Sequence, residues 1–126
     1  MQFEGIYTPL VTPYHEDFSL NEAALVETVE HLIAAGVHGF VVAGSTGEYY
    51  AQTPEERLEM MTRSAGLING RVPMVTGTGA TRTEDSIMYA KAAKAAGDMA
   101  EGEDDVVDRT ICVIEYDQQY DQLAAK

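Results

Sequence analysis

The sequence predicts an α/β protein made of three strand–helix units. Candidate strands begin near residues 3, 37 and 72, and an amphipathic helix follows each of them. A repeat of about 35 residues is typical of a βα unit, and successive units of this kind form a parallel sheet through right-handed crossovers. The segment 37–43 is mostly apolar and partly β-branched, as expected for a strand that such a sheet buries on both faces.

The first unit consists of a strand within residues 3–12 and a helix within residues 19–36. Asn21 or Ser19 is the candidate N-cap of this helix, and Gly36 is placed to end it. Spacing at i, i+3 and i+4 puts the apolar side chains of this segment on one helical stripe: Leu25, Val26, Val29, Leu32 and Ile33.

The second and third units follow the same plan. After the strand at 37–43, Thr53, Pro54 and Glu56 provide an N-cap, a proline in the first turn and the glutamate of a capping box. The apolar stripe of the helix that follows is Leu58, Met61, Ala65 and Ile68. A third strand at 72–77 precedes a helix that opens at Thr81 or Thr83 and runs to Gly97, with apolar positions at Ile87, Ala90 and Ala93.

The pattern changes near Asp98. Residues 98–126 hold nine acidic and two basic side chains, and the acidic run 101–105 is typical of a solvated spacer. We therefore divide the chain into a folded portion, residues 1–97, and a divergent acidic tail, residues 98–126. Within the tail, only residues 110–116 have strand-like character.

Charge and composition exclude several classes of function. The 126 residues carry a net charge of −13, which repels nucleic acid and anionic membrane surfaces. Neither a signal peptide nor a long apolar segment is evident, and Cys112 is the only cysteine, so a cytoplasmic protein is expected. The three histidines have no metal-ligand spacing, and no metal or other cofactor is expected.

The loop after the second strand is the strongest candidate site. Ligands of parallel α/β folds bind at the carboxyl ends of the strands, and here Gly44, Ser45, Thr46 and Gly47 place two hydroxyls between two glycines. Such a loop can hold a carboxylate through hydroxyl and amide groups, although a tight turn with locally satisfied hydroxyls explains the same residues. The glycines of the third loop, 76–81, match no nucleotide-binding fingerprint and are interpreted as turn residues.

Four motifs in this order resemble one known family: YTPLVTPY, GSTGE, TPEER, and VPMVTGTGA with TRTEDSI. Over residues 3–97 the chain is similar to the dihydrodipicolinate synthase and N-acetylneuraminate lyase family, the pyruvate-dependent class I aldolases built as (β/α)₈ barrels. The resemblance implies a partial (β/α)₈ TIM barrel of about three units. It also implies that Ser45 is a proton-relay hydroxyl, that Thr46 holds a keto-acid carboxylate, and that Gly44 and Gly47 keep the loop open.

The chain also departs from this family. Its members use a Schiff-base lysine on the sixth strand and a relay tyrosine on the fifth, and neither strand is recognisable here. Lys91, Lys94 and Lys126 have no desolvated setting that would lower a lysine pKa. A complete barrel needs typically about 250 residues.

Two hypotheses follow. In the first, the chain is a truncated family member that is inactive by itself and binds a small keto acid such as pyruvate only weakly. In the second, it is a competent lyase if the missing half complements it. The sheet edge after the third strand predicts self-association of the isolated chain, unless residues 111–114 dock there as a replacement strand.

Overall fold

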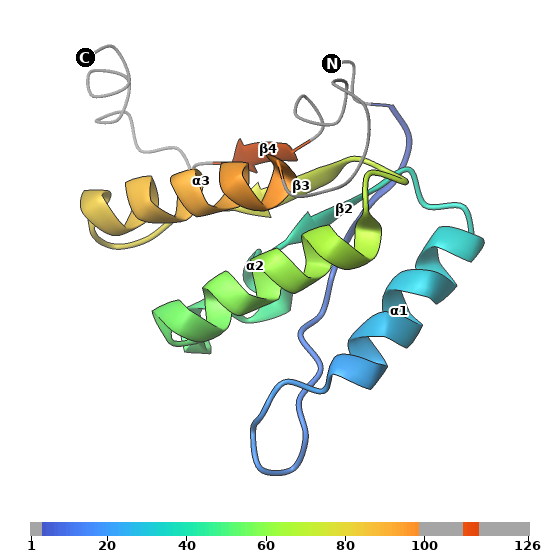
Figure 1. Cartoon of the computed structure of the whole chain (residues 1–126), viewed down its shortest axis with the longest axis horizontal. Coiled ribbons are helices and arrows are strands. Elements are labelled where there is room, and N and C mark those ends of the chain that lie inside the picture. Colours follow the sequence, from blue (N-terminus) through green and yellow to red (C-terminus); the bar gives the residue numbers. More distant parts are fainter. Residues whose placement is uncertain (1–3, 99–109, 114–126) are drawn as a thin grey trace.

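The computed structural model describes residues 4–98 and 110–113, which form a parallel sheet covered by three helices (Figure 1). The strands are β1 (Tyr7–Pro9), β2 (Gly39–Val42), β3 (Met74–Gly77) and β4 (Thr110–Val113), and they lie side by side in chain order. Each pairs in parallel with the next. One α-helix lies between each strand and the next: α1 (Glu22–Ala34), α2 (Pro54–Ile68) and α3 (Thr83–Asp98).

One apolar core joins the helices to one face of the sheet. Strand β2 contributes Phe40 and Val42, which are fully buried, and the helices supply most of the remaining members. Alternate strand residues point to opposite faces, so Val41 lies on the face away from the helices. The core residues of the helices are Leu25, Val29, Met60, Met61, Ala65, Ile68, Tyr89 and Ala96.

The capping signals in the sequence are confirmed. Asn21, and not Ser19, caps α1, because its Oδ1 accepts a 3.0 Å hydrogen bond from the Ala24 N–H. Helix α2 opens with a complete capping box, in which the Thr53 N–H donates to Glu56 Oε2 at 2.7 Å and the Glu56 N–H donates to Thr53 Oγ1 at 3.2 Å.

The predicted apolar stripe of α3 is correct at Ala93, which is fully buried, and wrong at Ile87. Ile87 is 46% exposed, whereas Ser86, Tyr89, Ala93 and Ala96 form the buried face. On this buried face the ring of Tyr89 packs on the guanidinium of Arg57 in α2. Ile87 lies two residues earlier, about 200° around the helix axis, and therefore faces solvent. Val26 of α1 is similarly more exposed than its stripe predicts, at 37%.

Strand β4 lies within residues 98–126, which the sequence sets apart as a divergent tail, in the one segment of that tail with strand-like character. Residues 110–113 pair with β3 in parallel, from Met74 opposite Thr110 to Gly77 opposite Val113. The alternative that residues 111–114 dock on this edge is confirmed for residues 111–113. The strand starts one residue earlier, and residue 114 lies outside the described residues. The acidic run 101–105 and Lys126 lie outside the described residues, and the division of the chain at residue 97 stays a prediction.

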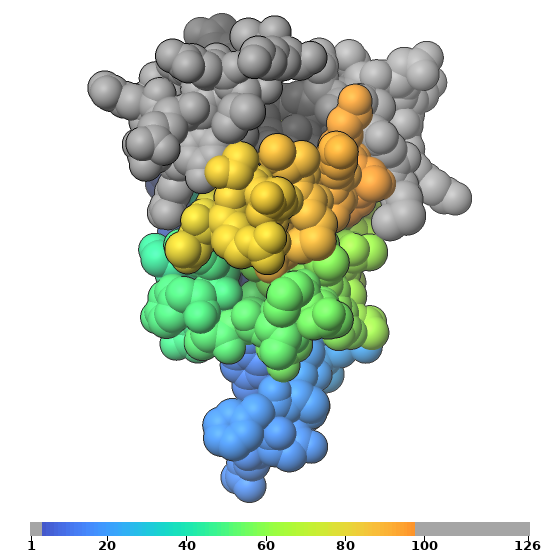
Figure 2. All heavy atoms as spheres, turned by 90° about the vertical axis from the view of Figure 1, so that its left-hand side faces the viewer, coloured from blue at the N-terminus to red at the C-terminus, as the bar shows by residue number. Residues whose placement is uncertain are grey.

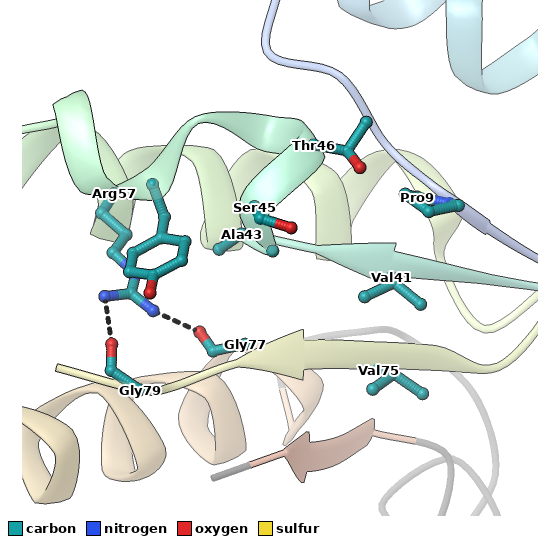
Figure 3. Close-up of a pocket in the computed structure, with 11 residues that line it drawn as sticks. Pro9, Val41, Ala43, Ser45, Thr46, Arg57, Val75, Gly77 and Gly79 are labelled. Atoms are coloured by element: carbon teal, nitrogen blue, oxygen red, sulfur yellow. Dashed lines mark hydrogen bonds between the residues drawn. The ribbon is translucent and has the colours of Figure 1, made fainter. Parts of the chain in front are cut away.

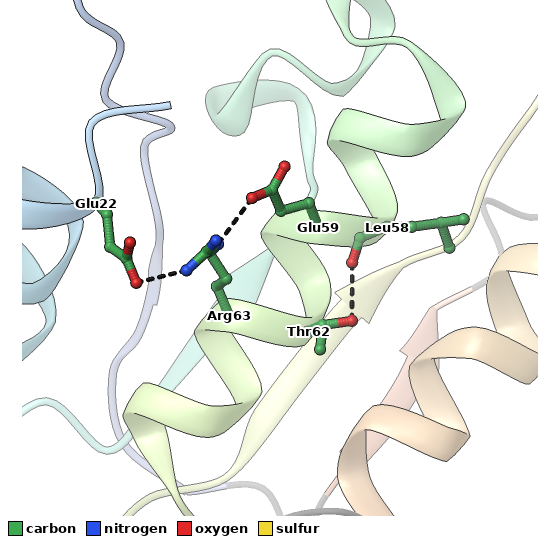
Figure 4. A network of polar contacts seen from close by, with 5 residues as sticks. All are labelled: Glu22, Leu58, Glu59, Thr62 and Arg63. Carbon is green, nitrogen blue, oxygen red and sulfur yellow. Dashed lines mark hydrogen bonds and ion pairs between the residues drawn. The ribbon is translucent and has the colours of Figure 1, made fainter. Parts of the chain in front are cut away.

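Ion pairs tie α1 to the rest of the molecule at the surface. Arg63 of α2 pairs with Glu22 of α1 and with Glu59 of its own helix (Figure 4). Arg71 donates to both carboxylate oxygens of Glu30, at 2.9 and 2.6 Å. Exposed pairs of this kind contribute little to stability individually, so the packed core holds the helices in place.

The segment between β1 and α1 forms a small hairpin-like loop that projects from the body of the protein (Figures 1 and 2). Tyr14 and Leu20 form an antiparallel bridge, and the Phe18 N–H donates to the His15 carbonyl at 3.0 Å. Phe18 has a left-handed backbone, with φ of 66°, and its side chain is 82% exposed. Across the described part of the chain, no helix combines the length and apolar character needed to cross a membrane.

Candidate functional site

A pocket of about 270 Å³ opens at the carboxyl ends of the first three strands (Figure 3). It lies at the edge of the sheet where ligands of parallel α/β folds bind. Its lining residues come from the strands, from the loop after β2, from α2 and from the loop after β3. They are Pro9, Val41, Ala43, Gly44, Ser45, Thr46, Tyr49, Arg57, Val75, Gly77 and Gly79.

The floor of the pocket is apolar because it is one row of the sheet. Pro9 pairs with Val41, and Val41 pairs with Val75, so the three residues lie in register on neighbouring strands. The next place in this row belongs to Ile111 of β4. Since alternate residues of these strands face the helices, the row belongs to the sheet face away from them.

The loop after β2 forms the polar rim. Ala43 has a left-handed backbone with φ of 55°, and a 3₁₀ helix, η1 (Ser45–Gly47), follows it. Within this turn the Gly47 N–H donates to the Gly44 carbonyl and the Glu48 N–H donates to the Ser45 carbonyl, both at 3.0 Å. The hydroxyls of Ser45 and Thr46 lie on the side of the loop that faces Pro9 and Val41 (Figure 3).

The predicted site residues separate into two groups. Gly44, Ser45 and Thr46 line the pocket, and Ser45 and Thr46 are exposed to solvent. Gly47 is buried behind them, where a Cβ atom would lie 3.0 Å from the Leu10 carbonyl oxygen. A role of Gly47 in ligand binding therefore stays a prediction. What the structure shows is that the absence of a side chain lets this residue pack closely against the Leu10 backbone. Glu48 is exposed and ends the turn with its own left-handed backbone, φ 59°.

Arg57 is a site residue that the sequence analysis missed. Its side chain is only 3% exposed, and its guanidinium donates to the carbonyls of Gly77 and Gly79, both at 2.8 Å (Figure 3). The rings of Tyr49 and Tyr89 lie 4.3 and 4.2 Å from the guanidinium carbon. The available signal was helical spacing, because Arg57 lies four, seven and eleven residues before three buried residues of α2: Met61, Ser64 and Ile68.

Gly77, the last residue of β3, has a role that the predicted turn does not include. Neither Gly77 nor Gly79 is among the described glycines with positive φ, so a left-handed turn does not explain them. A Cβ atom on Gly77 would lie 2.4 Å from the Ala43 carbonyl oxygen. Close approach of the β2 and β3 ends is therefore the reason for glycine here. Both carbonyls are held by Arg57, and both residues line the pocket.

The described lining of the pocket carries one positive formal charge although the protein is acidic. Of the described residues that line it, Arg57 carries the only formal charge, while the whole chain has a net charge of −13. A buried guanidinium is screened less than an exposed one, so its field acts strongly inside the pocket. The arrangement suits a small ligand that has an anionic group at the rim and an apolar group on the floor.

The sequence was compared with known proteins. The sequence profile of the Dihydrodipicolinate synthetase family matches residues 2–101. The chain belongs to this family. The 4-hydroxy-tetrahydrodipicolinate synthase of Streptococcus suis is 41% identical over 97 residues, which cover 77% of this chain and 31% of the relative.

Solved structures of dihydrodipicolinate synthase relatives have the same fold. A prophage protein of E. coli K12 from the dihydrodipicolinic acid synthase family, solved in complex with pyruvate, is 32% identical with a TM-score of 0.74, over 77% of this chain and 33% of that one. The 4-hydroxy-tetrahydrodipicolinate synthase of Methylacidiphilum fumariolicum is 28% identical with a TM-score of 0.76, over 92% of this chain and 35% of that one. The fold is therefore an incomplete (β/α)₈ barrel, and the chain spans about a third of the length of the relatives it matches.

The two described lysines of this family member lie away from the pocket. Lys91 and Lys94 are both exposed on α3, as their helical positions predict, and Lys126 lies outside the described residues. Among residues 4–98 and 110–113, no group of three or more His, Cys, Asp or Glu side chains is placed to hold a metal ion. His38 has a structural contact, since its Nδ1 accepts a 3.0 Å hydrogen bond from the Ile6 N–H.

Proposed function

We propose that this chain binds a small 2-keto acid such as pyruvate at residues 44–46 and that it does not catalyse aldol chemistry by itself. The observation that carries the proposal is the pocket at the carboxyl ends of β1, β2 and β3, with hydroxyls on its rim and an apolar floor. The pyruvate complex of the E. coli K12 relative supports the choice of ligand.

Each part of the pocket matches one part of a keto acid. The Thr46 hydroxyl would donate to the carboxylate, and the Ser45 hydroxyl would lie in the proton relay near the keto group. The methyl group of pyruvate would contact Val41 and Val75 on the floor. Arg57 would favour the anion through its charge and would hold the carbonyls of the β3 loop away from it.

The proposed inactivity rests on the lysines. A Schiff base forms by attack of an unprotonated lysine amine on the keto carbon with loss of water, and a desolvated setting is needed to lower the lysine pKa. The chain has only Lys91, Lys94 and Lys126, and the two that are described are exposed. The alternative is a competent lyase of this family in which a second polypeptide supplies the missing half of the barrel.

The test is reductive trapping with pyruvate and borohydride, followed by mass spectrometry of the intact chain. We expect no mass increase, whereas a full-length member of the family treated in parallel should be labelled. An adduct located at any of the three lysines would contradict the proposed inactivity.

Binding is tested separately by pyruvate titration in NMR. The affinity should be no better than about 1 mM, or roughly −4 kcal/mol, because water competes for the donors of an open pocket. The shifted amides should centre on residues 44–47 and should lose their response in the Ser45→Ala, Thr46→Val double variant. Shifts that persist in that variant would exclude this loop as the site.

Partners and location remain predictions of the sequence. The net charge of −13 supports the absence of nucleic-acid and membrane partners. A cytoplasmic location is likewise kept as a prediction. Self-association was predicted on the condition that the edge of β3 is open, and β4 occupies that edge, so this ground for it is absent.

A further inference from the structure

The carbonyl of Gly47 is held by two side chains from other parts of the chain. Thr12, which follows β1 and lies 35 residues earlier, donates its hydroxyl to this carbonyl at 2.8 Å. Gln52, which follows the 3₁₀ helix η2 (Tyr49–Ala51), donates from Nε2 to the same oxygen at 3.3 Å. Gly47 therefore connects the loop after β2 to the segment after β1.

Thr12, Gln52 and Tyr14 form one polar unit around that carbonyl. Gln52 Nε2 also lies 3.1 Å from Thr12 Oγ1 and 3.0 Å from the Tyr14 hydroxyl. The Gly47 oxygen is only an acceptor, so the amide nitrogen of Gln52 has to face it. Among the described residues Gln52 Oε1 has no hydrogen-bond partner, and the donor contacts alone therefore hold this side chain.

The unit adds side-chain hydrogen bonds to a turn whose own backbone hydrogen bonds are local, from Gly47 to Gly44 and from Glu48 to Ser45. Ser45 and Thr46 are exposed, so packing does not hold their side chains in place. The turn lies between two non-glycine residues in the left-handed region, Ala43 at φ 55° and Glu48 at φ 59°. Backbones of this kind persist only where surrounding contacts impose them. The contacts at Gly47, the last residue of η1, supply that constraint from behind the pocket.

We propose that Thr12 and Gln52 are positioning residues for the keto-acid site. By holding the Gly47 carbonyl they orient the Ser45 and Thr46 hydroxyls toward the pocket, although neither Thr12 nor Gln52 lines it. The effect of these two residues on pyruvate binding rests on the proposed function. The orientation of the loop itself is independent of any ligand.

The experiment compares Thr12→Val with Thr62→Val in the full chain. Thr62 is a matched control, because its hydroxyl also donates to a backbone carbonyl, that of Leu58 at 2.9 Å, and it is exposed on α2 (Figure 4). In pyruvate titrations followed by NMR, Thr12→Val should weaken binding about tenfold, which corresponds to roughly 1.4 kcal/mol. Thr62→Val should bind like the parent chain, and Thr12→Ser, which keeps the hydroxyl, should restore binding to within about twofold of the parent.

A second readout separates this inference from the proposed function. Without pyruvate, the amide shifts of Ser45 and Thr46 should move in Thr12→Val and in Gln52→Glu, which places an acceptor against the Gly47 carbonyl, but not in Thr62→Val. If the amides of the parent chain do not respond to pyruvate, the proposed function is wrong. The ligand-free shifts of Ser45 and Thr46 still test whether Thr12 and Gln52 position the loop. The inference is overturned if the Ser45 and Thr46 amide shifts of Thr12→Val are the same as those of the parent chain. If Thr12→Val does not fold, the same comparison is made with Gln52→Glu.

Discussion

Gly77 at the end of β3 lies directly against the backbone of Ala43 at the end of β2. A Cβ atom on Gly77 would be 2.4 Å from the Ala43 carbonyl oxygen and 3.0 Å from its carbonyl carbon. Both residues line the pocket, so this close approach brings the loops after β2 and β3 together. The Gly77 carbonyl is in turn held by Arg57.

Replacement of Gly77 by alanine should therefore destabilise the protein. The added methyl group meets backbone atoms that cannot rotate away, and overpacking of this kind costs about 1–3 kcal/mol. The free energy of unfolding from urea titration is the measurement. Gly66→Ala is the control, because Gly66 lies inside α2 with nothing within 4 Å of its Cβ position. That change should stabilise the protein by about 0.5–1 kcal/mol, and a Gly77→Ala variant as stable as the parent would contradict the steric argument.

Phe18→Gly should stabilise the protein. Phe18 has φ of 66° and is 82% exposed, so its side chain makes the left-handed backbone unfavourable while burying little apolar surface. Removal of the Cβ atom should recover about 1 kcal/mol. Phe18→Ala keeps the Cβ atom and should show no comparable gain in the same thermal unfolding experiment. Equal stability of the two variants would show that Cβ strain at this position is not significant.

Arg57→Lys should weaken both the fold and the site. A lysine cannot donate to the carbonyls of Gly77 and Gly79 as a planar fork, nor stack in the same way between Tyr49 and Tyr89. Loss of one hydrogen bond from a charged group costs about 1.5–3 kcal/mol. Urea denaturation should show a loss of this size. Arg82→Lys, at an exposed arginine paired with Glu84, should change stability by less than about 0.5 kcal/mol.

The pair of Glu30 and Arg71 should make stability depend on pH. The hydrogen bonds from Arg71 hold the pKa of Glu30 below its ordinary value of 4.5. A lowered carboxyl pKa in the folded state adds stability above the ordinary value, and that stability is lost as the pH falls through the lowered pKa. Glu30→Gln should therefore be less stable than the parent near pH 7, and the difference should shrink as the pH falls below 4.5 and through the lowered pKa of Glu30.

Glu27→Gln serves as the control for this experiment, since Glu27 is an exposed glutamate on the same helix. Urea midpoints of the three proteins across the pH range provide the comparison. A Glu30→Gln deficit that stays constant from neutral to acid pH would show that the ion pair does not contribute through the carboxylate charge.

The local sequence determined most of the secondary structure. Thr53, Pro54 and Glu56 form the capping box that their spacing predicts, and Asn21 caps α1. These signals depend on residues within one helical turn, and such contacts form in any environment that allows the helix. The loop at residues 44–46 was likewise predicted, because its glycines and hydroxyls follow an apolar strand and its motif resembles one family.

The tertiary structure decided what depends on distant partners. Strand β4 exists because residues 110–113 pair with β3 across more than thirty residues of chain, and their own composition did not specify that neighbour. Ile87 was predicted to be buried and is exposed, because α3 packs on α2 and the sheet with the face that carries Tyr89, Ala93 and Ala96. The need for glycine at residue 77 comes from Ala43, which is far away in the chain. A sequence pattern specifies which faces are apolar, but the partner of each face is selected only when the elements pack together.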